Sequence, residues 1–443
     1  MQYSTFAAID IGSYDVILEI FEISKKQGIR SVDKICHRME LGKDTYTLGK
    51  IRPEMEEELC RVLADFVRIM EGYRVDDYRA TASSAISEAS NSLYVLGKIH
   101  QLTGLSVTVL SNSEQRFLSY KALAAMEDNF NKIIEKGTAI LDLDGGSFQI
   151  SLFDKDALVT TQNIRMGSLR IRERLAGIQS ETEHYEEMVE ELIWNEVSSF
   201  KKMYLKDRKI ENIMLIGDVF TDSVYQNIEE KTTKIISREN FNTWYEKIIR
   251  QSPMELAVKL GIPLENASLM YPSAVIYKCL IDMMGAEHIW IPGVHMTRGI
   301  AYEYAEQMKL LKGGHNFEND ILMAAKNIGK RYAVNRPHVQ NLEMTALAMF
   351  DATKKMHGMK ERERLLLQMA VMLHDVGKYI SFNNVADSSY NIIMSNEIIG
   401  LSHIEREMVA LIARYNTVTL PSYDELVMES SLSAEQYLTC LLY

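Results

Sequence analysis

The sequence has few of the residues that mark linkers, disulfide frameworks or membrane spans. Only 7 prolines and 23 glycines among 443 residues argue against long linkers and low-complexity segments. The four cysteines show no Cys-x-x-Cys spacing, which disfavours a disulfide framework or a cysteine-rich zinc site. No run of about 18 apolar residues occurs, and the first residues lack the basic and apolar segments of a signal peptide. We therefore expect a cytoplasmic protein that does not span or bind a membrane.

Positive charge is also in deficit, because 61 acidic residues outnumber 49 basic ones and the formal net charge is −12. A protein that binds nucleic acid without sequence preference needs a basic surface to displace counterions, so we expect no nucleic-acid partner. A phosphorylated small molecule stays compatible with this charge, because a local cluster of donors can outweigh a distant negative field. The length exceeds that of one compact core, and two or three domains are expected.

One short pattern occurs twice, at residues 6–23 and 139–153. Each copy reads as a strand, an acidic Gly-Ser turn and a second strand: FAAIDIGSYDVILEIFEI and AILDLDGGSFQISLF. Glycine in such a turn lets the backbone approach an anion closely. The aspartate that ends each first strand, Asp10 or Asp142, could then hold Mg²⁺ against phosphate oxygens. Two ordinary hairpins are the alternative interpretation, because Asp-Gly turns are common in hairpins.

The remaining pattern of strands and helices predicts two α/β lobes followed by an all-α region. Helices are predicted over 51–73 and around 180–204, and a strand over 212–219. From about residue 316 the pattern is helical throughout. The predicted domains are lobe I at 1–127, lobe II at 128–305, a connector at 306–315 and a helical domain at 316–443.

Several phrases, in order along the chain, resemble the motifs of the exopolyphosphatase/guanosine pentaphosphate phosphatase (Ppx/GppA) family. AAIDIGSYDVILEI is similar to the opening D-x-G-S-N-S hairpin of the family, ATASSAISEASN to A-T-S-A-L-R-E-A-x-N, VLSNSEQRFLSY to I-S-G-x-E-E-A-R, and LDLDGGSFQI to D-I-G-G-G-S-T-E-L. The resemblance implies two actin-like α/β lobes (the ASKHA, ribonuclease H-like fold) with an inter-lobe cleft, followed by an all-α HD-type domain. It also implies release of terminal phosphate from inorganic polyphosphate or pppGpp, Mg²⁺ as cofactor, and a homodimer.

The same resemblance assigns roles to the two turns. They would be phosphate-binding loops that grip the substrate from both lobes, with a metal ion beside them. The implied phosphate-binding residues are Gly12, Ser13, Gly145, Gly146 and Ser147, and the implied metal ligands are Asp10 and Asp142.

Several residues differ from the family motifs at positions where the family has catalytic or phosphate-binding residues. The glutamate that serves the family as general base has its counterpart in Gln115, whose amide cannot accept a proton near neutral pH. Glu114 is adjacent, but neighbouring helix residues point about 100° apart, so it could be the catalytic base only if the turn shifts. Asp144 also replaces a glycine, and Gln149 replaces a glutamate. Two functions therefore stay open: a weakened or altered phosphohydrolase, and a catalytically inactive regulatory protein that binds polyphosphate or a guanosine polyphosphate.

The helical region contains His338, His374 and Asp375 in the order typical of HD hydrolases. These side chains could share one metal ion if His338 arrives from another helix. Within the 443 residues given, the later aspartate that such hydrolases need has no counterpart, and VADSS at 385–389 replaces a histidine-containing phrase of the family. A buried histidine satisfied by its neighbours is the alternative to a metal site. A metal-dependent hydrolase that uses these three residues is the third candidate function.

Overall fold

The computed structural model describes residues 4–126, 130–155, 157–176, 185–227, 234–311 and 315–443. Its contacts divide the chain into two compact units. The first unit comprises Met1–Asp156 and Gln162–His315, and the second comprises Ala157–Thr161 and Asn316–Tyr443. Among the helices of the described residues, none is both long enough and apolar enough to cross a membrane.

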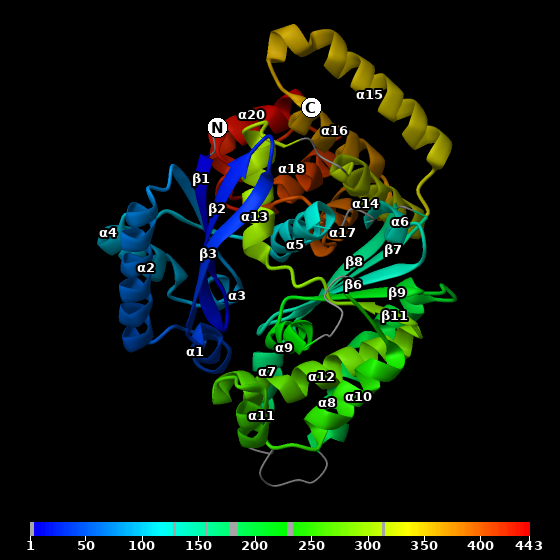
Figure 1. Cartoon of the computed structure of the whole chain (residues 1–443). Helices are drawn as coiled ribbons and strands as arrows, with labels where there is room; N and C mark the ends of the chain where they lie inside the picture. Colours follow the sequence, from blue (N-terminus) through cyan, green and yellow to red (C-terminus); the bar gives the residue numbers. More distant parts are fainter. Residues whose placement is uncertain (1–3, 127–129, 156, 177–184, 228–233, 312–314) are drawn as a thin grey trace. The chain divides into compact units, whose positions relative to one another are not determined.

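The chain forms two mixed β-sheets (Figure 1). The first sheet has the strand order β3-β2-β1-β4-β5, with β1 (Ser4–Ile11), β2 (Asp15–Ser24), β3 (Gly28–Arg38), β4 (Asp77–Ala82) and β5 (Val107–Val109). β1 and β2 form the first predicted hairpin and pair antiparallel, whereas β4 runs parallel to β1. The antiparallel pairing extends from Ser4 opposite Ile23 to Ile11 opposite Val16, so it ends at the Gly-Ser turn.

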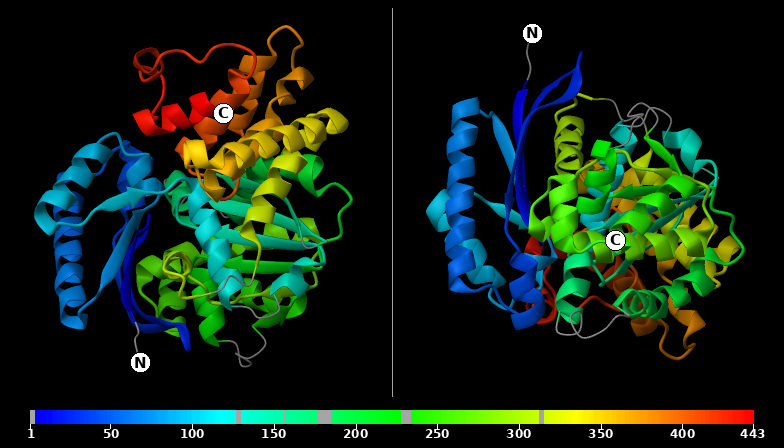
Figure 2. Two further views of the ribbon diagram at one scale, coloured as in Figure 1. Left: turned by 90° about the horizontal axis from the view of Figure 1, so that it is seen from above. Right: turned by 60° about the horizontal axis from the view of Figure 1, so that its bottom comes forward.

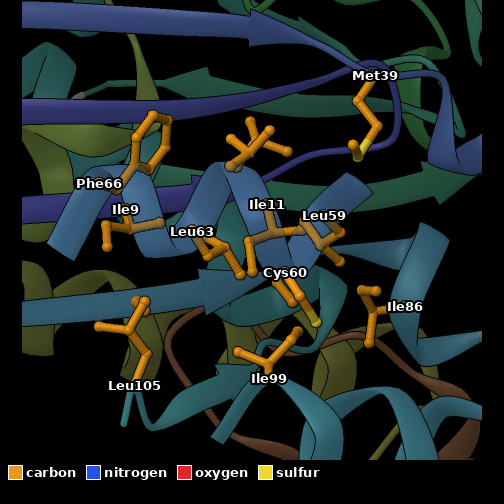
Figure 3. Packing of buried hydrophobic residues seen from close by; sticks show 14 of the residues in the cluster. Ile9, Ile11, Met39, Leu59, Cys60, Leu63, Phe66, Ile86, Ile99 and Leu105 are labelled. Atoms are coloured by element: carbon orange, nitrogen blue, oxygen red, sulfur yellow. The ribbon is translucent and has the colours of Figure 1, made fainter. Parts of the chain in front are cut away.

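One face of the first sheet is covered by α2 (Pro53–Tyr73) and α4 (Ser92–Thr103). Apolar residues recur along α2 every third or fourth position, and they face the sheet. Figure 3 shows Leu63 and Phe66 of this helix in the same cluster as Ile9 of β1. These three side chains are at most 2% exposed, and burying a side chain of this kind contributes about 1.5–3 kcal/mol.

The opposite face of this sheet packs against α13 (Met296–Gln307), which Figure 2 shows beside the strands. Helix α5 (Asn112–Met126) packs on α13 and contributes Leu118 to the same apolar cluster. Alternate residues of a strand point to opposite faces, so Phe6 faces these helices whereas Ile9 faces α2. The ring of Phe6 stacks on that of Tyr304 with 4.1 Å between their centroids. Helix α13 therefore packs on the first sheet.

The second sheet repeats the arrangement of the first. Its order is β10-β11-β9-β6-β7-β8, with β6 (Thr138–Leu143), β7 (Phe148–Asp154), β8 (Ala157–Ile164), β9 (Asn212–Ile216), β10 (Ile235–Ser237) and β11 (His288–Trp290). β6 and β7 form the second predicted hairpin, and β9 runs parallel to β6, as β4 runs parallel to β1. The repeated sequence pattern thus corresponds to a repeated unit of a hairpin and a parallel third strand.

The other helices of the first unit surround these sheets. They are α1 (Leu41–Leu48), α3 (Ser84–Ser87), α6 (Phe130–Ile134), α7 (Ser168–Leu175), α8 (Tyr185–Phe200), the π-helix η1 (Lys201–Leu205), α9 (Val219–Asn227), α10 (Arg238–Ile249), α11 (Pro253–Leu260) and α12 (Leu264–Met284). The predicted helix around 180–204 corresponds to α8 and η1 from residue 185 onward, and its first residues lie outside the described ones.

From residue 316 the described chain is helical and contains no strand, which confirms the predicted all-α region. Its elements are α14 (Phe317–Arg331), α15 (Arg336–His357), α16 (Glu361–Leu373), the 3₁₀ turn η2 (Val376–Tyr379), α17 (Val385–Ser395), α18 (His403–Arg414), α19 (Tyr423–Leu426) and α20 (Ala434–Leu442). Helices α15 and α16 pack against each other and bring His338 and His374 into one neighbourhood.

Candidate functional site

The Gly-Ser turns of the two hairpins lie against each other in the first unit. A Cβ atom added to Gly145 would lie 3.4 Å from the Cβ atom of Ser13. A Cβ atom added to Gly146 would overlap with the hydroxyl of Tyr46, so a larger residue cannot occupy this position without rearrangement. The two turns therefore face each other, which is the arrangement that a pair of phosphate-binding loops needs.

A cavity of about 280 Å³ adjoins these turns. The predicted site residues that line it are Asp10, Gly12, Gln115, Asp142 and Gly145. The other predicted residues of this site, Ser13, Glu114, Gly146 and Ser147, do not line it. The structure therefore brings together the two predicted metal ligands and one glycine from each turn.

Ser13 lies behind the cavity wall and is fully buried. Its Oγ atom lies 2.7 Å from the hydroxyl of Tyr46 and 3.3 Å from Oγ of Ser84. The guanidinium of Arg170 stacks over the Tyr46 ring, and its Nε donates to the carbonyl of Gly146 at 2.9 Å. The hydroxyl of Ser13 is thus engaged in a hydrogen-bond network of the protein itself.

Glu114 and Gln115 have different environments at the start of α5. The backbone N–H and the hydroxyl of Ser111 donate to Oε2 of Glu114 at 2.9 and 2.7 Å, and Ser111 accepts from the Glu114 N–H in return. This reciprocal arrangement is a capping box, which satisfies free N–H groups at the helix start. Gln115 lines the cavity, and its Nε2 donates to the Leu110 carbonyl at 3.2 Å. The geometry gives no support to Glu114 as the base.

Six carboxylates line the cavity, those of Asp10, Asp15, Asp142, Asp144, Asp218 and Asp222. Burial raises the pKa of Asp142 to about 6 and the pKa values of Asp144 and Asp218 to about 7. The pKa of Asp10 is raised by burial and by the negative charges of Asp15, Asp144 and Asp142. The negative charges of neighbouring carboxylates thus disfavour deprotonation of Asp10 and Asp144, and a cation would relieve this repulsion.

The residues present fit a hard divalent cation such as Mg²⁺. Asp10 and Asp142 each lie one residue before the end of their strand, β1 and β6, so the two hairpins contribute equivalent carboxylates to one cavity. The Oδ1 atom of Asp10 is buried and has no hydrogen-bond partner. A buried charged oxygen without a partner is unfavourable, and carboxylate oxygens are the ligands that Mg²⁺ prefers.

Two cationic side chains also line the cavity, and both come from β3, which was not among the predicted strands. Lys34 and Arg38 lie on the same face of this strand, because both are separated from Cys36 by two positions. Nη1 of Arg38 lies 3.2 Å from Oδ2 of Asp15. The alternation Lys-x-Cys-x-Arg in this segment was the sequence signal that could have identified them.

Polar contacts connect the first hairpin turn and its neighbours to helices next to the second sheet. The hydroxyl of Tyr14 donates to Oδ1 of Asn266 in α12 at 2.7 Å. In α7, Arg172 forms an ion pair of 2.8 Å with Glu40, and Arg170 forms one of 3.0 Å with Glu88. These contacts hold the two sides of the cavity together.

In the second unit, His338, His374 and Asp375 each place one ligand atom within 4.8 Å of the others. Nδ1 of His374 lies 2.8 Å from the Val371 carbonyl, which favours a proton on Nδ1 and leaves Nε2 as an acceptor or ligand. Oδ2 of Asp375 accepts from Lys378 at 2.5 Å. His338 and His374 also line a cavity of about 590 Å³. The structure thus brings together three potential metal ligands, one in α15 and two in the turn that directly follows α16.

Comparison with protein families and curated proteins gives consistent matches for both units. The model of the Ppx/GppA phosphatase family matches residues 20–308, and that of Ppx/GppA phosphatase, domain III, matches residues 322–441. A guanosine-5'-triphosphate,3'-diphosphate pyrophosphatase of Vibrio atlanticus is 19% identical, and the alignment covers 98% of this chain and 85% of that protein. A bifunctional 3-dehydroquinate synthase/phosphatase of Fusobacterium nucleatum is 21% identical, over 64% of this chain and only 44% of that protein. The chain therefore spans less than half the length of this relative.

Solved structures with the same fold include proteins of two bacteria. An exopolyphosphatase from Cytophaga hutchinsonii has a TM-score of 0.61 at 17% identity and covers 69% of this chain and 98% of its own. The Aquifex aeolicus member of the Ppx/GppA family has a TM-score of 0.57 at 18% identity and covers 69% of this chain and 99% of its own. These likenesses, together with the match of domain III to residues 322–441, confirm the predicted fold of an actin-like α/β region followed by a helical domain.

Proposed function

The chain belongs to the Ppx/GppA phosphatase family, and from this premise we propose that it is a phosphohydrolase. It would release terminal phosphate from inorganic polyphosphate or from a guanosine polyphosphate such as pppGpp. The observation that carries the proposal is that the two glycine turns meet beside a cavity lined by Asp10 and Asp142. The names of the Vibrio pyrophosphatase and the Cytophaga exopolyphosphatase support the two substrate classes.

The cavity residues would share the tasks of phosphoryl transfer to water. Gly12 and Gly145 allow the backbone to approach the terminal phosphate, and Lys34 and Arg38 supply positive charge for its oxygens. Mg²⁺ held by Asp10 and Asp142 would, when bound, neutralise phosphoryl oxygens. The side-chain amide of Gln115 can orient the attacking water but cannot take its proton.

Phosphate release from long-chain polyphosphate and from pppGpp in the presence of Mg²⁺ tests this proposal. Asp142→Asn should abolish release, because the amide keeps the shape of the side chain and removes the charge that the cation needs. Asp154→Asn is the matched control, because Asp154 ends β7 at the edge of the sheet away from the turn. Hydrolysis would be contradicted if the wild-type protein released phosphate from neither substrate.

A regulatory binding protein without catalysis is the second candidate function, and the amide at Gln115 favours it. In this case the cavity would hold polyphosphate or a guanosine polyphosphate without cleaving it. Calorimetric titration with both ligands separates the two candidates. Tight binding without turnover, together with turnover in Gln115→Glu, would identify the binding protein.

A metal-dependent hydrolase in the second unit is the third candidate function, favoured by the proximity of His338, His374 and Asp375. Three protein ligands leave a coordination position for water or substrate, and the adjacent cavity of about 590 Å³ could hold the substrate. Activity that requires Mn²⁺, disappears in His374→Ala and persists in Asp142→Asn would identify this candidate.

A further inference from the structure

We propose that Asp218 is the general base of the cavity in the first unit, where it accepts the proton of the attacking water. This inference rests on the proposed phosphohydrolase function, because a base is needed only if water attacks the phosphoryl group. It assigns the step that Gln115 cannot perform to a residue that the sequence motifs did not identify.

Asp218 reaches the cavity through the turn that follows β9. Strand β9 runs parallel to β6 and places Ile216 opposite Asp142. The next residue, Gly217, has a φ of +103°, and a Cβ atom there would overlap with Oδ1 of Asp142. Only glycine fits this close approach, and the turn then directs Asp218 into the lining of the cavity.

The two carboxylate oxygens of Asp218 have different environments. Oδ1 accepts from the Thr221 N–H at 3.1 Å and lies 3.3 Å from the hydroxyl of Tyr277. Oδ2 is buried and has no hydrogen-bond partner. The hydroxyl of Ser273 is close enough to lower the pKa of Asp218, but its Oγ atom also makes no hydrogen bond of normal geometry. Oδ1 is therefore held in place, and Oδ2 has acceptor capacity that no hydrogen bond of the protein uses.

The other carboxylates of the cavity have different partners. Asp144 accepts from the Gly145 N–H at 2.6 Å, and Asp15 is paired with Arg38. Asp222 lies 3.5 Å from Nε2 of His295. Asp10 and Asp142 fit the cation. Among the carboxylates of the cavity, Asp218 is thus neither paired with a cationic side chain nor assigned to the cation, and we assign the proton transfer to it.

The electrostatic surroundings of Asp218 agree with this role. Burial raises its pKa to about 7; Ser273, the Thr221 N–H and Tyr277 lower it, and the charge of Asp222 raises it. A general base is most effective when its pKa lies near the working pH. A substantial fraction of Asp218 is then deprotonated at neutral pH and still basic enough to take a proton.

The proposed step is a hydrolysis with all atoms accounted for. The oxygen of water forms a bond to the terminal phosphorus while the bridging P–O bond breaks in line with it. The proton of the water passes to the carboxylate of Asp218, which lines the cavity, and then to solvent. The bridging oxygen leaves with the shortened phosphate chain, and inorganic phosphate is the other product.

The test compares wild type, Asp218→Asn, Asp218→Glu and the double variant Asp218→Asn/Gln115→Glu, with Asp154→Asn as control. Phosphate release is measured across the pH range from about 5 to 9, and substrate binding is measured by calorimetry. Asp218→Asn should lose about 10²–10⁴-fold in kcat with substrate binding retained, and its residual rate should no longer rise through about pH 7. Asp218→Glu should recover part of the rate with a displaced pH profile, and Gln115→Glu should recover part of it in the double variant.

The failures of the two proposals are distinguishable. If the wild-type protein releases phosphate and Asp218→Asn keeps the same rate and pH profile, the assignment of Asp218 is overturned and the phosphohydrolase stands. If folded Asp218→Asn loses substrate binding, Asp218 is a binding residue and the assignment is also overturned. If the wild-type protein releases no phosphate, the proposed function itself fails.

Discussion

At the scale of single residues, neighbours in the sequence take different tasks because the backbone directs them apart. Glu114 turns back to Ser111 and caps α5, whereas Gln115 lines the cavity. Adjacent helix residues differ by about 100° in direction, so one of such a pair can serve the helix and the other the site. The Ser-x-x-Glu pattern at 111–114 is itself the signature of a capping box, and it would have predicted the position of Glu114.

Glu114→Ala tests this structural role. Loss of the cap should lower the free energy of unfolding by about 1 kcal/mol, measured by urea denaturation. Phosphate release per folded molecule should be unchanged, because the carboxylate does not line the cavity. A selective loss of phosphate release in a protein of unchanged stability would show that Glu114 is the base after all.

Gly146→Ala tests the close packing of the second turn. The added methyl group would overlap with the hydroxyls of Tyr46 and Ser84. Overpacking of this kind should lower the free energy of unfolding by about 1–3 kcal/mol and reduce phosphate release. Gly97→Ala in α4 is the control, because a Cβ atom there meets nothing within 4 Å, and it should raise stability by about 0.5–1 kcal/mol.

At the scale of elements, the duplicated unit explains why the site lies where it does. In each sheet the hairpin ends at a glycine turn, and the third strand runs parallel to the first. The carboxyl ends of the parallel strands therefore lie at one edge of each sheet, and the functional side chains follow them. The hairpins could be predicted from local patterns of strand and turn residues. The short strands β10 and β11, each of three residues, carry too few positions for any periodicity.

The pairing of α15 with α16 makes its own prediction about metal binding. The wild-type protein should bind Mn²⁺ or Zn²⁺ in calorimetric titration, because His338 and His374 meet beside Asp375. His374→Ala should weaken this affinity at least about tenfold, and the matched control His403→Ala in α18 should leave it unchanged. Equal affinities of wild type and His374→Ala would support a structural histidine instead.

At the scale of the whole molecule, the protein has a net charge of −12, and several of its aspartates line the cavity of the first unit. The raised pKa values of Asp142, Asp144 and Asp218 mean that the folded state holds protons that the unfolded chain releases at its ordinary pKa of 3.8. Between about pH 4 and 7 the folded state therefore binds more protons, and stability falls as pH rises through this range. A bound cation counteracts this loss of stability at higher pH, because it binds the deprotonated carboxylates of the folded state.

The thermal unfolding midpoint should follow this linkage. Without divalent cations, these groups should make the midpoint higher at about pH 5 than at about pH 8. Mg²⁺ should raise the midpoint more at the higher pH, and Asp142→Asn should reduce both the pH dependence and the effect of Mg²⁺. A midpoint that is independent of pH and Mg²⁺ would contradict the cation site.

The sequence by itself determined the duplicated hairpins, the order of α/β and all-α regions and the family, because these depend on local periodicity, turn residues and ordered motifs. Only the tertiary structure decided that α13 packs on the first sheet, that β3 brings Lys34 and Arg38 to the cavity, and that Asp218 lies there rather than Glu114. These outcomes depend on contacts between residues far apart in the chain. Local patterns of hydrophobicity and charge do not encode which distant surfaces will pack together.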